Sequence, residues 1–434
     1  MKGRVRKISG HDHTDLAAGW EVAASPPGAL STPADSSFTN LSWHPAARLG
    51  TVAAVLQARG EWSLESAPRR FDAEDWWYRA RFDRPWPSDP DASVILGLDG
   101  LATLAQVWLN GQSLLTSDNM FVSHEQPVGH LLSRDNELVL RFEALDTALA
   151  RKRPRPRWRT PMVANQRLNA FRTTLLGRTP GWSPPAAPVG PWRPIWLQAR
   201  RDVQVGAPRI RTHVQGDVGL LELDCEIRPL GRASLREIVL VVSRDGHSES
   251  VRMTRGAGDI FAGRLRLPSV DLWWPHTHGE PALYTARLEI LLENAAREPT
   301  SVDLGQIGFR NLEIDRSDGD FAVRVNGVPV FCRGACWTPL DCVSLQSSAS
   351  QIETALSQVC SAGMNMLRVG GTMVYESDAF LDACDAHGIL LWQDFMFANM
   401  DYPQDDAAFE RSVTLECTQQ LERLAGRPSL AVLC

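Results

Sequence analysis

The stretch SDAFLDACDAHGILLWQDF, Ser377–Phe395, combines a helix pattern, a glycine stop and a run of strand-forming apolar residues. The same order recurs on either side of it. SQIETALSQVCSAG (Ser350–Gly363) precedes MNMLRV (Met364–Val369), and DDAAFERSVTLECTQQLERLAG (Asp405–Gly426) precedes SLAVLC (Ser429–Cys434). Helices that alternate with short apolar strands are typical of parallel β/α units.

The ends of these helices carry capping signals. Ser350 and Glu353 stand at the spacing of a capping box, and Gly363 follows the last residue of the same helix. The third helix is expected to bury one apolar face, whose members are Phe409, Val413, Cys417, Leu421 and Leu424.

A further strand, VFCRGACW (Val330–Trp337), precedes these units, so residues 310–434 are expected to hold four strands and three helices. A (β/α)8 TIM barrel needs about 250 residues. We therefore expect residues 310–434 to form the N-terminal half of such a barrel. SLAVLC would be its fourth, buried strand, and the other half would lie beyond Cys434.

The first 200 residues favour β-structure. DWWYRARFD (Asp75–Asp83) and ASVILGLDG (Ala92–Gly100) resemble short strands, and NELVLRFEAL (Asn136–Leu145) alternates like a half-buried strand. Asn110-Gly111 lies between β-formers, a pattern that favours a type I′ hairpin. Many short strands separated by turns predict a jelly-roll-like sandwich over residues 1–200.

Residues 201–309 show longer alternating strands. The three clearest are LLELDCEIRPL (Leu220–Leu230), LREIVLVVSR (Leu235–Arg244) and ALYTARLEILLE (Ala282–Glu293). About 100 residues of this pattern are typical of an immunoglobulin-like sandwich. The predicted fold class is therefore multidomain, β plus α/β, with two sandwiches ahead of the half barrel.

Charge and hydropathy narrow the functional classes. The chain has 45 basic and 51 acidic residues and a net charge of -6, which disfavours nucleic acid as a general partner. The basic stretch RKRPRPRWR (Arg151–Arg159) could bind nucleic acid, but its prolines and the acidic chain favour a solvated loop. No apolar run reaches the roughly 18 residues of a membrane span, and no secretory h-region is visible. We expect a cytoplasmic protein.

The eight cysteines include no CxxC pair, so buried, reduced thiols are favoured over disulfides. Cys332 and Cys336 lack histidines at zinc-ligand spacing, and the histidines of HDH (His11–His13) and HTH (His276–His278) are expected to be exposed. There is no GxSxG elbow, P-loop or dinucleotide fingerprint. The sequence therefore predicts no metal and no cofactor.

Five stretches resemble the β-mannosidase branch of glycoside hydrolase family 2, and the resemblance runs from about residue 15 to the end. They are DWWYRARF, LDGLATLAQVWLNGQSLLTSDNMFVSHE, LWWPHTHGEPALYT, NGVPVFCRGACWTPLD and AGMNMLRVGGTMVYESDAFLDACDAHGILLWQDFMFANMDYP. The resemblance implies a galactose-binding-like sandwich over residues 1–200 and a carbohydrate substrate.

The resemblance implies a retaining exo-β-glycosidase that removes terminal β-linked sugars. Such enzymes use an acid/base carboxyl group and a nucleophilic carboxylate about 5–5.5 Å apart. In the family, the acid/base glutamate follows the fourth barrel strand and the nucleophile comes later. Both are expected beyond Cys434, so no catalytic residue is expected in this chain and the chain alone is expected to be inactive.

By the same resemblance, Trp337, Arg368 and Asp394 occupy substrate-pocket positions at strand ends, and Trp182 is expected to form a wall of the pocket. Purely structural roles stay open as alternatives: Arg368 and Asp394 could form an ion pair, and Trp337 and Trp182 could be packing residues. Glu376 is interpreted as a helix N-terminal charge rather than a catalytic group.

Two departures affect the identity of the sugar. Ser183 stands where the family carries an aspartate that reaches the sugar, and Gly370 stands where it carries a tryptophan. Specificity for mannose is therefore open. The alternative function is a non-catalytic carbohydrate-binding or scaffold protein that uses the sandwiches. A reading frame that continues past Cys434 with a Gly-Asn-x-Glu-like motif would favour the enzyme over this alternative. The oligomeric state is left open.

Overall fold

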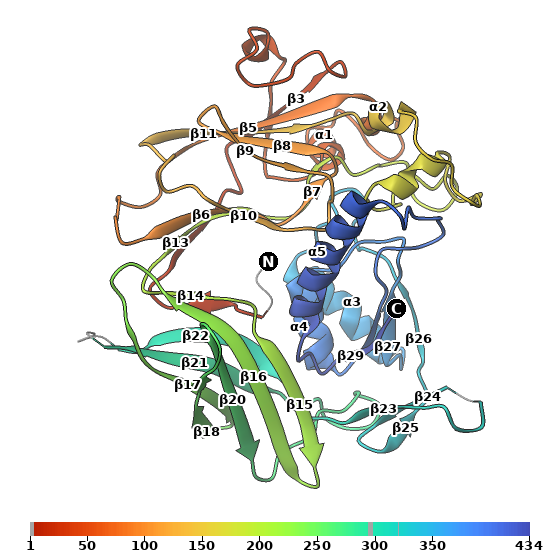
Figure 1. Ribbon diagram of the computed structural model, residues 1–434. Coiled ribbons are helices and arrows are strands. Elements are labelled where there is room, and N and C mark those ends of the chain that lie inside the picture. Colours follow the sequence, from red (N-terminus) through yellow and green to blue (C-terminus); the bar gives the residue numbers. More distant parts are fainter. Residues whose placement is uncertain (1–3, 294–297, 320) are drawn as a thin grey trace.

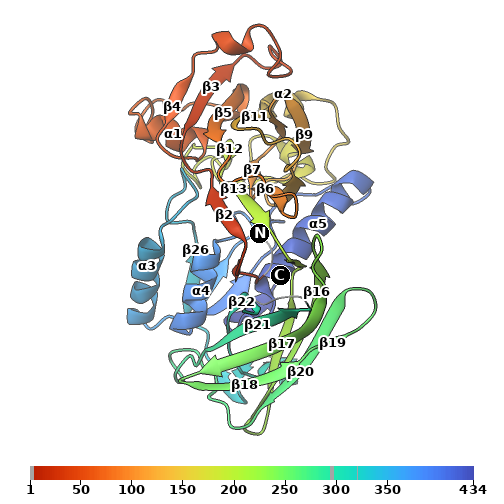
Figure 2. The same cartoon turned by 90° about the vertical axis from the view of Figure 1, so that its left-hand side faces the viewer.

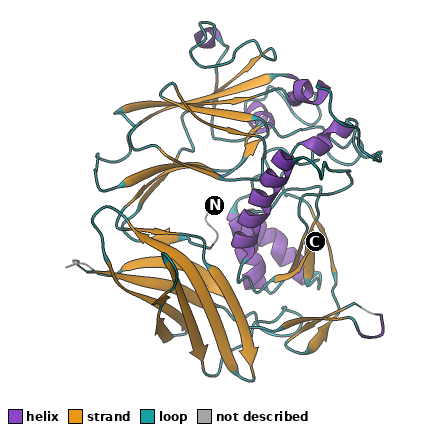
Figure 3. Ribbon diagram, viewed as in Figure 1, coloured by secondary structure: helices purple, strands orange, loops and turns teal. Residues whose placement is uncertain are grey.

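The computed structural model describes residues 4–293, 298–319 and 321–434. Two β-sandwiches and a β/α part make up the chain (Figure 1). The first sandwich lies at the top of the view, the second at the lower left, and the β/α part against both of them. Figure 2 shows the same arrangement from the side, and Figure 3 shows that most of the helix belongs to the β/α part.

The first sandwich encloses its core between an antiparallel six-stranded sheet and an antiparallel four-stranded sheet. The six-stranded sheet runs β4 (His44–Ala46), β3 (Trp20–Ser25), β5 (Asp75–Asp83), β11 (Asp135–Phe142), β8 (Ala105–Leu109), β9 (Gln112–Ser117). The four-stranded sheet runs β10 (His124–Pro127), β6 (Ser93–Leu98), β13 (Ile195–Arg200), β2 (Asp12–Asp15). Smaller elements are the β7–β12 pair (Leu101–Ala102, Gly190–Pro191), α1 (Val52–Ala58), α2 (Leu145–Ala150), and the 3-10 turns η1 (Phe38–Asn40), η2 (Phe71–Ala73) and η3 (Gln166–Ala170).

The strands predicted for this sandwich are present, with one change in burial. Strand β5 has the predicted bounds, and Asn110 and Gly111 both adopt positive φ, 51° and 80°, as a type I′ turn requires. Strand β11 was predicted to be half-buried, but it is buried along most of its length. The reason is its central place between β5 and β8, which lets its polar Arg141 pair with buried Asp75 at 2.7 Å.

The second sandwich has a separate core between two antiparallel five-stranded sheets. One sheet runs β1 (Lys7–Ile8), β22 (Thr300–Ile307), β21 (Tyr284–Leu292), β17 (Leu235–Arg244), β18 (His247–Arg252). The other runs β14 (Val203–Val205), β16 (Val218–Pro229), β20 (Ile260–Leu267), β19 (Thr254–Arg255), with β15 (Arg209–Gln215) also on β16. The first strand of the chain therefore belongs to this second sandwich, an arrangement that the sequence did not suggest.

A short antiparallel sheet leads into the β/α part. It contains β23 (Leu312–Asp315), β24 (Ala322–Val325) and β25 (Val328–Val330), with the 3-10 turn η4 (Ser317–Gly319) between the first two. The predicted strand Val330–Trp337 is thus two elements, because Val330 ends β25 and the parallel strand β26 covers only Gly334–Trp337.

The β/α part contains a four-stranded sheet whose neighbouring strands are all parallel, as predicted. Its order is β26 (Gly334–Trp337), β27 (Met366–Val369), β28 (Leu390–Gln393), β29 (Leu430–Leu433). The helices between the strands are α3 (Ala349–Ser361), α4 (Asp378–His387) and α5 (Ala407–Leu424). Strand β29, predicted to be buried, is only half-buried because it lies at the sheet edge, and Leu433 is 40% exposed.

The caps of these helices differ slightly from the prediction. The capping box of α3 is formed by Ser348 and Gln351, two residues before the predicted pair. Helix α4 ends at Gly388, whose φ of 66° supplies the left-handed conformation that closes a helix.

The predicted buried face of α5 is confirmed only in part: Leu424 is buried, but Phe409, Val413 and Cys417 are half-buried. Leu421, expected in the core, is 46% exposed, whereas Glu416, Gln420 and Arg423 are buried. These polar groups have partners on other elements, and Arg423 donates to Asp378 at 2.8 Å. A hydrophobic pattern cannot reveal a helix face that packs through paired polar groups.

Glu416 joins α5 to the first sandwich. Its carboxylate accepts hydrogen bonds from Arg172 at 2.7 and 2.8 Å, from the Tyr375 hydroxyl at 2.8 Å and from Asn119 at 3.0 Å. Glu416 and Arg172 are fully buried. Burial alone lowers the pKa of Arg172, but the hydrogen bonds and charge of Glu416 outweigh it and raise that pKa, so Arg172 stays charged.

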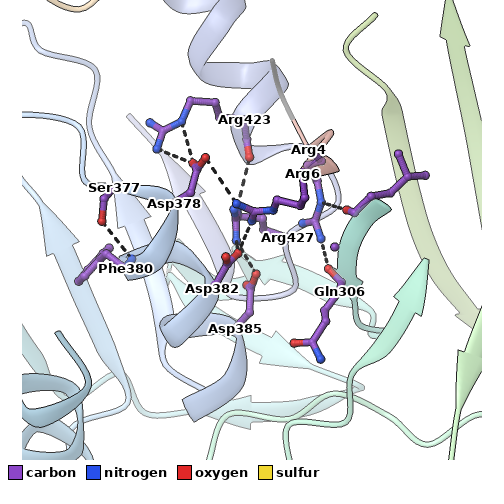
Figure 4. A network of polar contacts seen from close by, with 12 residues as sticks. Arg4, Arg6, Gln306, Ser377, Asp378, Phe380, Asp382, Asp385, Arg423 and Arg427 are labelled. Atoms are coloured by element: carbon purple, nitrogen blue, oxygen red, sulfur yellow. Dashed lines mark hydrogen bonds and ion pairs between the residues drawn. The ribbon is translucent and has the colours of Figure 1, made fainter. Parts of the chain in front are cut away.

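The N-terminal segment joins the second sandwich to α4 and α5. Arg4 is buried and donates to the Gln306 carbonyl of β22, and burial lowers its pKa to about 10. Arg6 lies beside Asp382 of α4, to which Arg427 also donates at 2.8 Å (Figure 4). Cations from two distant parts of the chain, Arg6 and Arg427, therefore meet on α4 and link it to the N-terminal segment.

Candidate functional site

A cavity of about 560 Å³ lies at the carboxyl ends of the parallel strands. Trp337 ends β26, Arg368 is in β27, Asp394 follows β28 and Cys434 follows β29, and all four line the cavity. Parallel strands bring their carboxyl ends to one edge of a sheet, which explains this gathering. Trp182 from the first sandwich adds another wall. The four residues predicted to bind substrate therefore share one cavity.

Arg368 and Asp394 form the ion pair that was left open as an alternative. Nη2 of Arg368 donates to Oδ2 of Asp394 at 2.8 Å, Nε donates to Oδ1 at 3.2 Å, and the Gly371 amide adds a third bond at 3.1 Å. The bonds to Asp394 raise the pKa of Arg368. The Arg368 side chain is 45% exposed, against 10% for Asp394. The pair thus fixes a cation whose remaining N–H groups are open to a ligand.

Trp337 is both a core residue and a cavity wall. It is 8% exposed, and its ring packs on Phe380 with centroids 4.8 Å apart. Its Nε1 donates to Oε1 of Glu376 at 2.9 Å. Glu376 is therefore not a first-turn charge of α4, because Ser377 caps that helix and Asp378 is its first-turn acid. Burial raises the pKa of Glu376, and the bond from Trp337 partly offsets this effect.

Trp182 and Ser183 play different parts in one loop. Trp182 is 67% exposed and faces the cavity, so it is not a buried packing anchor. Ser183 stays within the loop: its hydroxyl accepts from the Gly177 amide at 2.9 Å and lies 2.7 Å from the Thr179 hydroxyl. Ser183 is not among the residues that line the cavity.

Gly370 leaves room in the cavity. A Cβ built at this position meets no atom within 4 Å. A larger side chain, such as the tryptophan that the family resemblance implies, would therefore project into the space that a ligand could use.

Sequence reasoning missed three thiols and two aromatic residues of the cavity. Cys336, Cys417 and Cys434 line it, together with Phe395 and Phe397. The cysteines of the chain are all free, but the expectation of general burial was wrong, since Cys336 and Cys434 are exposed. Their positions in or just after strands, or on α5, could have signalled this.

The histidine runs have local polar partners. Nε2 of His13 lies 3.0 Å from Asp15, and that of His276 lies 2.7 Å from the Met364 carbonyl. Within the described ranges, no three His, Cys, Asp or Glu side chains are arranged to hold a metal ion. Among the helices that the structure describes, none is long and apolar enough to cross a membrane.

The cavity can bind a polar ligand but does not contain two catalytic carboxylates. Among the described residues that line it, Asp394 is the only acid, and Arg368 and Gly371 already engage it. Retaining glycoside hydrolysis requires two carboxyl groups about 5–5.5 Å apart.

Sequence comparison relates the chain to β-mannosidases. A family model described as glycosyl hydrolase 2 galactose-binding domain-like matches residues 29–193. β-Mannosidase B of Aspergillus terreus is 29% identical over 374 residues, which cover 84% of this chain and 43% of that protein. The Aspergillus flavus protein of the same name is 30% identical over 373 residues, with coverages of 83% and 43%. The chain thus spans less than half the length of these relatives.

Solved structures show the same fold. The β-D-mannosidase of Dictyoglomus thermophilum superposes with a TM-score of 0.81 at 25% identity, and the match covers 98% of this chain and 52% of that one. The exo-chitosanase of Amycolatopsis orientalis gives a TM-score of 0.69 at 19% identity over 97% and 49% of the two chains. Together with the matches in sequence, these similarities relate the chain to glycoside hydrolase family 2, and within it to the β-mannosidases.

Proposed function

We propose that this chain forms the sugar-binding part of a retaining exo-β-glycosidase of β-mannosidase type. The observation that carries the proposal is the meeting of Trp182, Trp337, Arg368 and Asp394 around one cavity at the carboxyl ends of parallel strands. The ligand is the terminal β-linked sugar of an oligosaccharide or glycoconjugate.

The cavity residues have different roles in binding the sugar. The Arg368 fork donates hydrogen bonds to sugar hydroxyls, and Asp394 holds that fork in place and accepts hydroxyl bonds with its remaining lone pairs. The exposed indole of Trp182 presents an apolar face to the C–H groups of the ring.

The proposal places both catalytic carboxylates outside residues 1–434. It is supported by the single acid in the cavity and by the coverage of only 43% of the relatives. On this proposal, residues 310–434 are the first half of a (β/α)8 barrel, residues 201–309 an immunoglobulin-like domain, and residues 1–200 a galactose-binding-like jelly roll. The eight free cysteines favour a cytoplasmic location.

The test is binding without turnover. Ligand-observed NMR should detect binding of one of the methyl β-glycosides of mannose, glucosamine or glucuronic acid to this chain. Aryl β-glycosides incubated with the chain should not be hydrolysed. Arg368→Met should abolish binding, whereas Arg211→Gln, at a 70% exposed arginine of the second sandwich, should not. Turnover by this chain, or binding that survives Arg368→Met, would refute the proposal.

A second candidate is a non-catalytic carbohydrate-binding or scaffold protein. The single carboxylate of the cavity favours it. Turnover of aryl β-glycosides by the product of a reading frame extended beyond Cys434 would exclude this candidate.

A further inference from the structure

A second cavity, of about 550 Å³, lies beside the proposed sugar site. Aromatic rings of the first sandwich and of the β/α part line it, namely Trp158, Phe397, Tyr402 and Phe409. Phe397 and Tyr402 meet edge to face with centroids 5.0 Å apart, and Tyr402 stacks on Phe409 at 6.1 Å. Carboxyl groups of Asp401 and Glu410 lie among these rings.

The two cavities lie next to each other and have a wall residue in common. Phe397 lines both of them. On α5, Cys417 lines the first cavity and Val413 the second, and these two residues lie about 6 Å apart along the helix axis. The two cavities therefore adjoin at Phe397 and along α5.

The basic loop 151–159, which carries Trp158, is bound to Asp401 through Arg157. Arg157 donates from Nε and Nη2 to Oδ1 of Asp401 at 2.9 and 2.6 Å, and its backbone amide donates to Oδ2 at 2.5 Å. Pro154 and Pro156 restrict the loop further. Trp158 is 48% exposed, so its large ring lines the cavity without being covered.

We propose that this cavity binds the second sugar unit of the oligosaccharide whose terminal unit occupies the Arg368 cavity. The inference rests on the proposed function. Ring faces stack against the C–H faces of a pyranose, and a few polar groups orient its hydroxyls, which is the usual composition of a small-ligand site.

Nucleic acid is a poorer occupant despite the basic loop. The opposite wall carries Asp401 and Glu410, and Asp405 and Asp406 stand nearby in the chain. Arg157 is engaged by Asp401, and Arg153 lies over the Phe171 ring at 4.8 Å. Acids on one wall and engaged cations on the other disfavour a polyanion.

The experiment measures affinity against ligand length by calorimetry and ligand-observed NMR. The probes are the methyl β-glycoside that binds in the panel above and the β-1,4-linked disaccharide and trisaccharide of the same sugar. The full chain should bind the disaccharide about tenfold more tightly than the monosaccharide, a gain consistent with stacking on aromatic rings. The trisaccharide should add little.

Trp158→Ala should remove this gain and leave monosaccharide affinity unchanged. The control is Phe321→Ala, at an aromatic residue that is 55% exposed and directly precedes β24 of the separate sheet of β23–β25. Equal affinities for monosaccharide and disaccharide, or a gain that persists in Trp158→Ala, would overturn the second site alone. Binding of a single-stranded oligonucleotide in place of the disaccharide would overturn it too. Failure to bind any of the sugars would overturn the proposed function as well.

Discussion

Replacing Glu416 by glutamine should loosen α5 from the first sandwich. The substitution keeps the shape of the side chain but leaves the fully buried Arg172 without its counter-ion. Two hydrogen bonds from Arg172 and those from Tyr375 and Asn119 weaken together. Removing one partner of a buried pair costs about 3–5 kcal/mol.

Hydrogen exchange of the α5 amides measures this cost directly. Converted to an equilibrium constant, the loss predicts protection factors lower by about a hundredfold to a few thousandfold over Ala407–Leu424. Protection in Glu416→Gln within about twofold of the parent would refute the view that this pair holds the two parts together.

Two further variants separate the ion pair from general packing. The double variant Arg172→Met with Glu416→Gln should lose less than the sum of the single variants, with a coupling of up to about 3 kcal/mol. The matched control is Arg264→Gln, which breaks the exposed pair with Glu222, whose side chains are 85% and 35% exposed. Its effect should stay below about 1 kcal/mol.

Three more outcomes are expected. Because burial raises the pKa of Glu376 above its ordinary value of 4.5, the stability that protonated Glu376 contributes is complete below pH 4.5 and is lost as the pH rises through the raised pKa. In urea unfolding, Glu376→Gln should therefore lose less stability than the parent protein as the pH rises through this range. An identical pH profile of the two proteins would contradict this expectation. Gly370→Trp should change the unfolding free energy by less than about 1 kcal/mol but weaken methyl β-glycoside binding by about tenfold or more, because open space surrounds Gly370 in the cavity; unchanged affinity by NMR would count against the site. Gly177→Ala should cost more than about 2 kcal/mol in urea unfolding and displace Trp182, since φ is +76° and the new Cβ would lie 2.3 Å from the Ala187 nitrogen; a wild-type midpoint would show that the loop adapts.

The sequence predicted those elements whose formation depends on local signals. The Asn110-Gly111 turn needs two positive φ angles, and this dipeptide adopts them readily. The parallel order of β26 to β29 follows from the repeated strand–helix pattern. The burial of α5 could not be predicted in this way, because its inner face is polar and its partners, such as Arg172, lie more than 200 residues away in the chain.

The residues of the candidate site also differ in how far the sequence could predict them. Arg368 and Asp394 could be chosen because they stand at strand ends, where the topology brings side chains together. Trp158 stood in a stretch for which a solvated loop was favoured over nucleic-acid binding, and nothing in the sequence indicates that Asp401 holds this loop beside Phe397. Contacts between separate parts of the chain determine that cavity.

The pairing of β1 with β22 affects the order in which the chain can fold. Lys7 lies opposite Asp303, so this edge of the second sandwich stays incomplete until nearly 300 further residues have been synthesised. At about 5–20 residues per second, the N-terminal segment waits roughly 15–60 s for its partner strand. The first sandwich, built entirely from the intervening residues, can fold during that delay, whereas docking of Arg4 and Arg6 must be one of the last events of assembly.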